Sequence, residues 1–143
     1  MSEAFVFTFK DGLLSPLAHD LKLRVTKLEI ADKRAVFDAS SLRVESAGGP
    51  LPKTFYSEIE KNIREDVLRS SKFPQVVFEA AEVGDTEITG KLTLCGVTRD
   101  IRLKRHGNVV EYALNQPDFG IKPFTAMLGT LKVKPVVKVQ VTL

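Results

Sequence analysis

Apolar and polar residues alternate along most of the chain. At the N-terminus, "FVFTFK" places Phe5, Phe7 and Phe9 at every second position. A period of two is typical of a β-strand with one buried face and one solvated face. The alternation recurs in "DLKLRVTKLEI", "VVFEAAEV", "ITGKLTLCG", "TRDIRLKRH" and "VVEYALN". It ends in "LKVKPVVKVQVTL", where every odd position from 131 to 143 is apolar or proline.

Three of these strands carry signs of a bend. The apolar parity slips by one residue between Val25 and Leu28, which is the effect of a β-bulge. The stretch "RAVFDASSLRV" alternates less cleanly and predicts an irregular strand. Pro135 cannot donate to a sheet ladder, so we expect a bulge or kink there in the last strand.

One segment departs from the period of two. In "SEIEKNIREDVLR" the apolar residues recur four apart from Ile59 onward, which indicates an amphipathic helix. Ser57 and Glu60 have the spacing of a capping box, in which each side chain would satisfy a free backbone N–H. The sequence therefore predicts one short α-helix, over about 58–69, that stops before the proline of "SSKFP".

About eight short strands and one helix predict an all-β, antiparallel sandwich or barrel. The first and last strands are both strongly amphipathic, and pairing them would remove two exposed edges. We therefore expect an extended eight-stranded barrel formed by one domain, residues 1–143. A barrel of this size encloses either packed side chains or one small ligand.

Composition agrees with a single soluble domain. The chain has 143 residues, of which 43% are hydrophobic and 27% charged. The net charge of +3 is spread along the chain, which argues against nucleic acid as a partner. No apolar run is long enough for a transmembrane helix, and the N-terminus lacks the features of a secretory signal. We expect a cytoplasmic protein without a cofactor, with a homodimer among its oligomeric states.

Residues capable of catalysis are few and scattered. Cys95 is the only cysteine, so an internal disulfide is excluded. It ends a strand beside a glycine, on the face opposite the apolar series, and no helix start is predicted near it to lower its pKa, so a structural role is favoured. Ser15, His19 and Asp20 could form a hydrolase triad only through a turn, because neighbours in a strand point to opposite faces. Two histidines and one cysteine, far apart in sequence, do not predict a metal site.

Three segments, in order, resemble the YceI-like family. These are "DVLRSSKFPQVVFEA", "GKLTLCGVTRDIRL" and "DFGIKPFTAMLGTLKVKPVVKVQVTL". The resemblance covers roughly residues 15 to 143, and "SPLAHDLKL" is similar to a shorter, leaderless branch of the family. It implies a lipocalin-like antiparallel barrel with an apolar interior. Some members of the family bind a long isoprenoid or a related amphiphile, and many are periplasmic.

Three functions remain open from the sequence. The first is a carrier or sequestering protein for an amphiphilic lipid, such as an isoprenoid, a quinone-like molecule or a fatty-acid derivative. The second is a filled barrel that acts through its surface, as an interaction or stress-related protein. The third is a small hydrolase or isomerase that uses His19. The interior volume separates the first two.

For a hollow barrel, alternation predicts the residues that line the interior and contact an apolar or amphiphilic ligand. They are Phe5, Phe7, Leu21, Leu23, Val25, Phe78, Leu92, Leu94, Ile101, Leu103 and Val139. A few polar groups at the mouth would set recognition. His19, Arg99 and Lys122 are the candidates for these groups.

Overall fold

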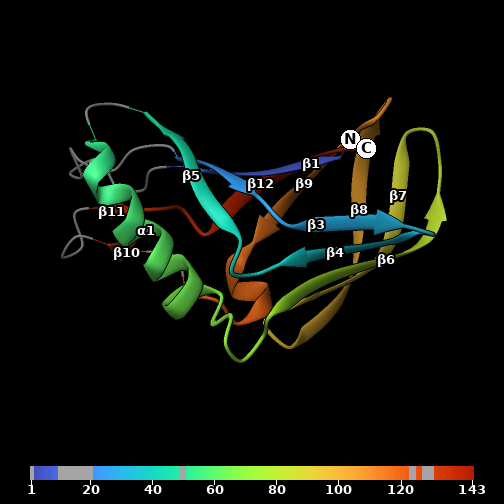
Figure 1. Ribbon diagram of the computed structural model, residues 1–143. Coiled ribbons are helices and arrows are strands. Elements are labelled where there is room, and N and C mark those ends of the chain that lie inside the picture. The colour runs from blue at the N-terminus through green and yellow to red at the C-terminus, as the bar shows by residue number, and fades with distance from the viewer. Residues whose placement is uncertain (1, 10–20, 49–50, 123–124, 127–130) are drawn as a thin grey trace.

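The computed structural model describes residues 2–9, 21–48, 51–122, 125–126 and 131–143. These residues form one ten-stranded antiparallel sheet and a separate two-stranded ladder (Figure 1). The strands are β1 (Glu3–Thr8), β2 (Leu21–Val25), β3 (Leu28–Ala31), β4 (Arg34–Asp38), β5 (Leu42–Ala47), β6 (Gln75–Val83), β7 (Glu87–Leu94), β8 (Val97–His106), β9 (Val109–Asn115), β10 (Thr125–Ala126), β11 (Leu131–Lys132) and β12 (Val136–Thr142). The helical elements are η1 (Lys53–Phe55), α1 (Tyr56–Asn62), the π-helical turn η2 (Ile63–Val67) and η3 (Gln116–Phe119).

The large sheet curls on itself around one bent hairpin. Its strand order is β3-β4-β6-β7-β8-β9-β12-β1-β2-β5, so β3 and β5 lie at the two ends of the order. Both ends belong to the same hairpin, because β2 runs on into β3 and β4 runs on into β5. Two backbone hydrogen bonds hold the bend, from Thr26 N–H to the Ser41 carbonyl and from Asp38 N–H to the Lys27 carbonyl, both 3.0 Å. The result is a barrel-like wall around an interior.

The all-β, barrel-like class predicted from alternation is confirmed, but the predicted number of eight strands is too low. Two long strands are each split in two, at Thr26 and Lys27 and again at residues 39–41. The first break falls on the parity slip between Val25 and Leu28. A bend at these points lets one hairpin belong to both ends of the sheet, which a straight strand of the same length could not do.

The first and last strands of the sheet pair as expected. β1 runs antiparallel to β12, with Val6 opposite Val139. The kink predicted at Pro135 is also present, because β12 begins at the next residue, Val136. The pairing joins one edge of β1 to one edge of β12 and leaves the inward positions of both strands on a common face.

The helix forms where its apolar stripe predicts, but its start differs. The helical region of α1 and η2 runs from Tyr56 to Val67 and follows directly on η1. The predicted capping box is wrong, because Ser57 lies inside the helix and no side chain caps its start. The Glu60 carboxylate instead accepts a 2.8 Å hydrogen bond from the backbone N–H of Val44. This bond ties α1 to β5, the strand at the end of the sheet order.

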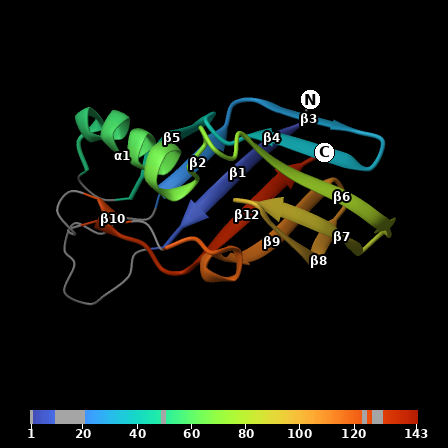
Figure 2. The same cartoon turned by 90° about the horizontal axis from the view of Figure 1, so that it is seen from below.

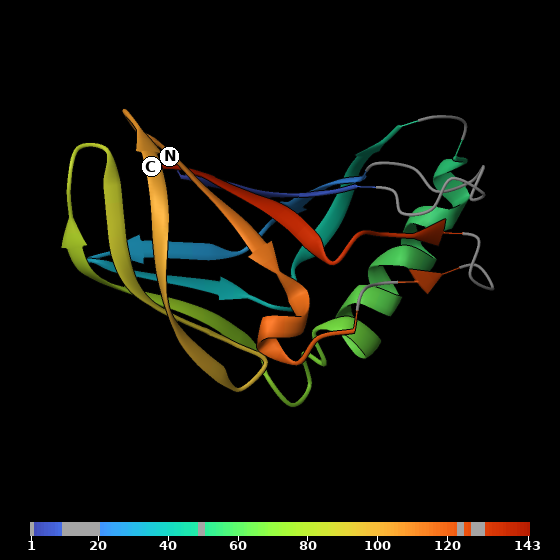
Figure 3. The same ribbon diagram turned by 180° about the vertical axis from the view of Figure 1, so that it is seen from behind.

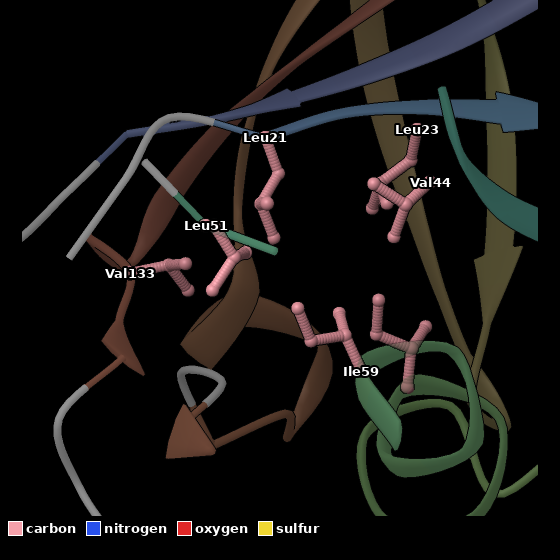
Figure 4. Close-up of a cluster of buried hydrophobic side chains, with 7 residues drawn as sticks. Leu21, Leu23, Val44, Leu51, Ile59 and Val133 are labelled. Carbon is pink, nitrogen blue, oxygen red and sulfur yellow. The ribbon is translucent and has the colours of Figure 1, made fainter. Parts of the chain in front are cut away.

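The helix lies across one end of the barrel, whereas both termini and the β3–β4 turn lie at the other end (Figures 1 and 2). A buried apolar cluster fills the space between α1 and the wall (Figure 4). Ile59 at 0% and Leu21 at 1% exposure are its most enclosed members. The cluster consists of Leu21, Leu23, Val44, Leu51, Ile59, Ile63 and Val133. It closes this end of the interior.

Candidate functional site

The curled sheet encloses a cavity of about 440 Å³. Inward-facing side chains from most of the strands border it, and nearly all of them are apolar. Nine of the eleven predicted lining residues lie on this cavity: Leu21, Leu23, Val25, Phe78, Leu92, Leu94, Ile101, Leu103 and Val139. The barrel is therefore hollow, which the filled-core interpretation does not predict.

The prediction placed Phe5 and Phe7 on the wrong face of β1. Val6, between them, borders the cavity instead. The Phe5 ring is covered from outside by Lys22, whose Nζ lies 4.4 Å from the ring centroid, and by the Arg24 guanidinium at 4.7 Å. Cationic side chains with long aliphatic stems can cover an aromatic ring on a solvent-facing surface. An aromatic repeat therefore does not distinguish the inside of this strand from the outside.

Other lining residues were not predicted, although the same alternation points to several of them. In "VVEYALN" every second residue from Val110 faces inward. On the bent hairpin the inward positions could not be assigned before the break was known. The lining residues that the prediction omitted include Val6, Ile30, Ala35, Phe37, Val110, Tyr112, Leu114 and Val137.

The two ends of the cavity differ in exposure. At the helix end, Ile63 and Val133 border the cavity and are buried. At the opposite end, Val83 and Leu143 also border the cavity but are 47% and 40% exposed. Lys33 of the β3–β4 turn and Arg34 at the start of β4 also border the cavity at this end, and Arg34 pairs with Glu79. We call this open end the mouth.

A second discontinuity lies in the wall between β8 and β9. Three pairs join these strands next to their turn, the last being Lys104 opposite Glu111. Beyond that pair they separate (gold and orange in Figure 3), whereas β8 pairs with β7 along its length. Residues 97–103 and 112–115 thus face each other without a ladder in the described structure, and we call this the β8–β9 seam. The cavity is bordered from both sides of the seam, by Ile101 and Leu103 on β8 and by Tyr112 and Leu114 on β9.

Polar groups gather at this seam. Arg99 lies opposite Leu92 in the β7–β8 ladder, so it starts from an inward position, yet it is exposed. Its Nη1 donates a 3.4 Å hydrogen bond to the Asp118 carbonyl in η3. Burial raises the pKa of Tyr112, the Asp118 carboxylate raises it further, and the Arg99 guanidinium opposes this shift. Arg99, Tyr112 and Asp118 therefore form one electrostatic group.

The other two polar candidates are not brought to this group by any described contact. Lys122 follows the buried Ile121 and is exposed. His19 lies outside the described residues, as do Ser15 and Asp20 of the triad considered above.

The comparison with protein families assigns the chain. The sequence model of the family described as the YceI-like domain matches residues 8–143. The chain belongs to this family. No curated protein matches it.

Two solved structures share the fold of this YceI-like domain. One is a polyisoprenoid binding domain from Saccharophagus degradans implicated in plant cell wall breakdown. It has a TM-score of 0.63 and 11% identity, over 98% of this chain and 90% of that one. The other is BcnA of Burkholderia cenocepacia, with a TM-score of 0.54 and 15% identity, over 98% and 93% of the two chains. Likeness at these identities shows the fold alone.

The only cysteine side chain of the YceI-like domain, Cys95, lies against the backbone carbonyl groups of Val67 and Leu68. Cys95 sits in the β7–β8 turn with a φ of 50°, and its side chain is buried. The prediction placed it on the outer face with Thr93, which is wrong because the left-handed turn redirects the side chain. Its Sγ donates a 3.4 Å hydrogen bond to the Leu68 carbonyl. Burial raises the thiol pKa, and the nearby Arg69 opposes this shift. A thiol in such surroundings is a poor nucleophile.

The described part of the domain has neither a metal-binding cluster nor a membrane-spanning helix. No group of three or more His, Cys, Asp or Glu side chains is placed to hold a metal ion. No helix within the described ranges is both long enough and apolar enough to cross a membrane.

Proposed function

We propose that this protein binds one amphiphilic lipid, with the long apolar chain inside the barrel cavity, as a carrier or sequestering protein. The isoprenoid, quinone-like and fatty-acid classes all fit this description. The observation that carries the proposal is the hollow interior of about 440 Å³ with an almost wholly apolar lining. The structural neighbour described as a polyisoprenoid binding domain supports the same class of ligand.

The size of the cavity suits a chain rather than a compact metabolite. Typical ligand pockets measure about 300–1,000 Å³. A protein cavity of about 150 Å³ takes up one benzene molecule, with its six carbons. By that ratio the interior of 440 Å³ has room for about 18 carbon atoms.

An empty interior would be costly. Cavities left by core truncations destabilise proteins by about 24 cal/mol per Å³. A void of 440 Å³ would thus cost on the order of 10 kcal/mol, which is comparable to the whole stability of a domain. Water gains little from a site with so few polar partners. An apolar chain therefore stabilises the fold by occupying the cavity.

The proposed role is one of binding without chemistry. The cavity lining is suited to hold a chain, and the buried Cys95 thiol, with its raised pKa, supports no nucleophilic step. A cytoplasmic location and a homodimeric state are further proposals. Cell fractionation and size-exclusion chromatography would test them.

Native mass spectrometry of protein purified from its own host tests the proposal. A stoichiometric added mass, released by organic extraction, is the expected result, and it would identify the ligand class. An apo mass that does not change after incubation with isoprenoids and fatty acids would refute lipid binding. In that case the search would move to partners of the outer surface.

A further inference from the structure

The β8–β9 seam is where charged and polar groups meet an otherwise apolar wall. We propose that it is the head-group site of the bound amphiphile, and that Arg99 and Tyr112 select an anionic head, either a carboxylate or a phosphate. This inference rests on the proposed lipid binding, because the chain would lie in the cavity while the head lies at the seam.

Two arginines of β8 take inward positions, and their hydrogen bonding differs. Arg105 lies opposite Val110, and its guanidinium donates to two carbonyl oxygens, those of Gly107 at 2.8 Å and Gly84 at 3.2 Å. Among the described residues, Arg99 donates once, at 3.4 Å, to a carbonyl. It makes no ion pair with any residue in the described ranges. Since a guanidinium carries five N–H donors, most of those of Arg99 remain available to a ligand.

Tyr112 provides a second donor on the opposite side of the seam. It borders the cavity from β9, beside Val139 in the ladder. Burial and the Asp118 carboxylate raise its pKa, so the phenol keeps its proton at neutral pH. The same carboxylate accepts a 3.1 Å hydrogen bond from the Asn115 amide. The seam thus offers a guanidinium and a phenol O–H beside one carboxylate that already has a partner.

These donors favour an anion over a neutral head. A guanidinium binds carboxylates and phosphates through paired, charge-assisted hydrogen bonds that are about twice as strong as neutral ones. At the mouth the Arg34 guanidinium is already paired with Glu79, at 3.5 Å, and Lys33, which also borders the cavity there, has a point charge rather than the paired donors of a guanidinium. The seam therefore offers an anionic head group more available guanidinium donors than the mouth does.

Matched ligand pairs test the head group separately from the chain. The probes are hexadecanoic acid against hexadecan-1-ol, and geranylgeranyl phosphate against geranylgeraniol. Each competes with the neutral dye N-phenyl-1-naphthylamine, and displacement gives the dissociation constant. The variants are Arg99→Ala, Tyr112→Phe and Asp118→Asn. Arg102→Ala is the matched control, because Arg102 lies on the same strand but is 73% exposed and pairs with Glu87 outside the seam.

We expect the wild type to bind at least one of the two anionic probes about tenfold more tightly than its alcohol. Arg99→Ala should abolish this preference by weakening only the anion, and Tyr112→Phe should reduce it. Asp118→Asn should increase it, because an opposing charge is removed. If only one of the two anions is preferred over its alcohol, that result shows whether the anionic head group belongs to a fatty acid or to an isoprenyl phosphate.

Four results would overturn the assignment. Equal affinity of the wild type for anion and alcohol would refute head-group selection and leave lipid binding intact. A preference that survives in Arg99→Ala, or that is lost equally in Arg102→Ala, would remove the seam as its origin. Failure of all four probes to displace the dye would refute the proposed function, and the head-group site with it.

Discussion

The affinity of neutral lipids should rise with chain length until the cavity is full. Burial of each methylene contributes about 0.8 kcal/mol, which is about a fourfold gain in affinity. The volume of 440 Å³ sets the break near about 18 carbons. Beyond it, further methylenes lie in solvent and the gain per carbon falls toward zero. Isothermal titration of linear alcohols from octanol to tetracosanol measures both the slope and the break.

A substitution that fills the cavity should move this break. Ala35 is 9% exposed and borders the cavity, so Ala35→Phe adds a ring of six carbons to the interior. The break should fall to about 12 carbons, with an unchanged slope for shorter chains. Ala113→Phe is the matched control, because Ala113 lies opposite Lys138 on the outer side of the wall. The control should leave the break where it is in the wild type.

Two results would refute this reasoning. A break that is unchanged in Ala35→Phe would show that the chain does not occupy the space beside Ala35. A shift of equal size in Ala113→Phe would show that the substitutions act on the fold rather than on the cavity. Thermal unfolding of each apo variant provides the check on folding.

Three further predictions concern the fold. Gly90→Ala should lower the free energy of unfolding, measured by urea denaturation, by about 1–3 kcal/mol. The reason is that a Cβ at this position would lie 2.7 Å from the Phe78 ring and against the neighbouring backbone. An unchanged denaturation midpoint would contradict this close approach. Glu60→Ala should lower the free energy of unfolding by about 1–2 kcal/mol, because the backbone N–H of Val44 in β5 would lose its acceptor. Ser57→Ala should change it little. A larger loss in Ser57→Ala than in Glu60→Ala would support the capping box instead. The Cys95 thiol should react slowly with iodoacetamide in the native state and quickly in urea. Because folding raises the pKa of this thiol, its contribution to the free energy of unfolding is present below the ordinary thiol pKa and is lost as the pH rises above it. The free energy of unfolding should therefore fall less steeply at alkaline pH in Cys95→Ala than in the wild type.

Alternation predicted the wall wherever one face meets the cavity and the other meets water. In β7, Leu92 and Leu94 face inward as the pattern requires, and Thr93 faces out. In β1 the large aromatic residues lie on the outer face, whereas the inner face carries only Ala4, Val6 and Thr8. The cations that cover Phe5 come from another strand. Their position depends on strand register, which short-range periodicity does not contain.

The helix shows the same limit. Its existence followed from the apolar stripe, but the partner of Glu60 is Val44, in a strand that precedes the helix. A local motif such as the capping box competes with such long-range contacts, and here the long-range contact prevails. The position of Arg99 was also predictable only in part. The sequence analysis placed Arg99 among the polar groups of the mouth, whereas its place at a seam depends on where β8 and β9 separate.

The departures from a well-packed barrel concentrate around one space. A cavity of about 440 Å³ forgoes side-chain packing, and the β8–β9 seam forgoes ladder hydrogen bonds along residues 97–103 and 112–115. Each is unfavourable on its own, because voids lose dispersion contacts and open edges invite aggregation. Natural proteins depart from such rules chiefly at functional sites. A lipid whose chain fills the cavity and whose head reaches the seam would compensate for both costs, so saturating ligand should raise the melting temperature and protect the β8 and β9 amides from hydrogen exchange together. Protection of the cavity strands without the seam would place the head at the mouth instead.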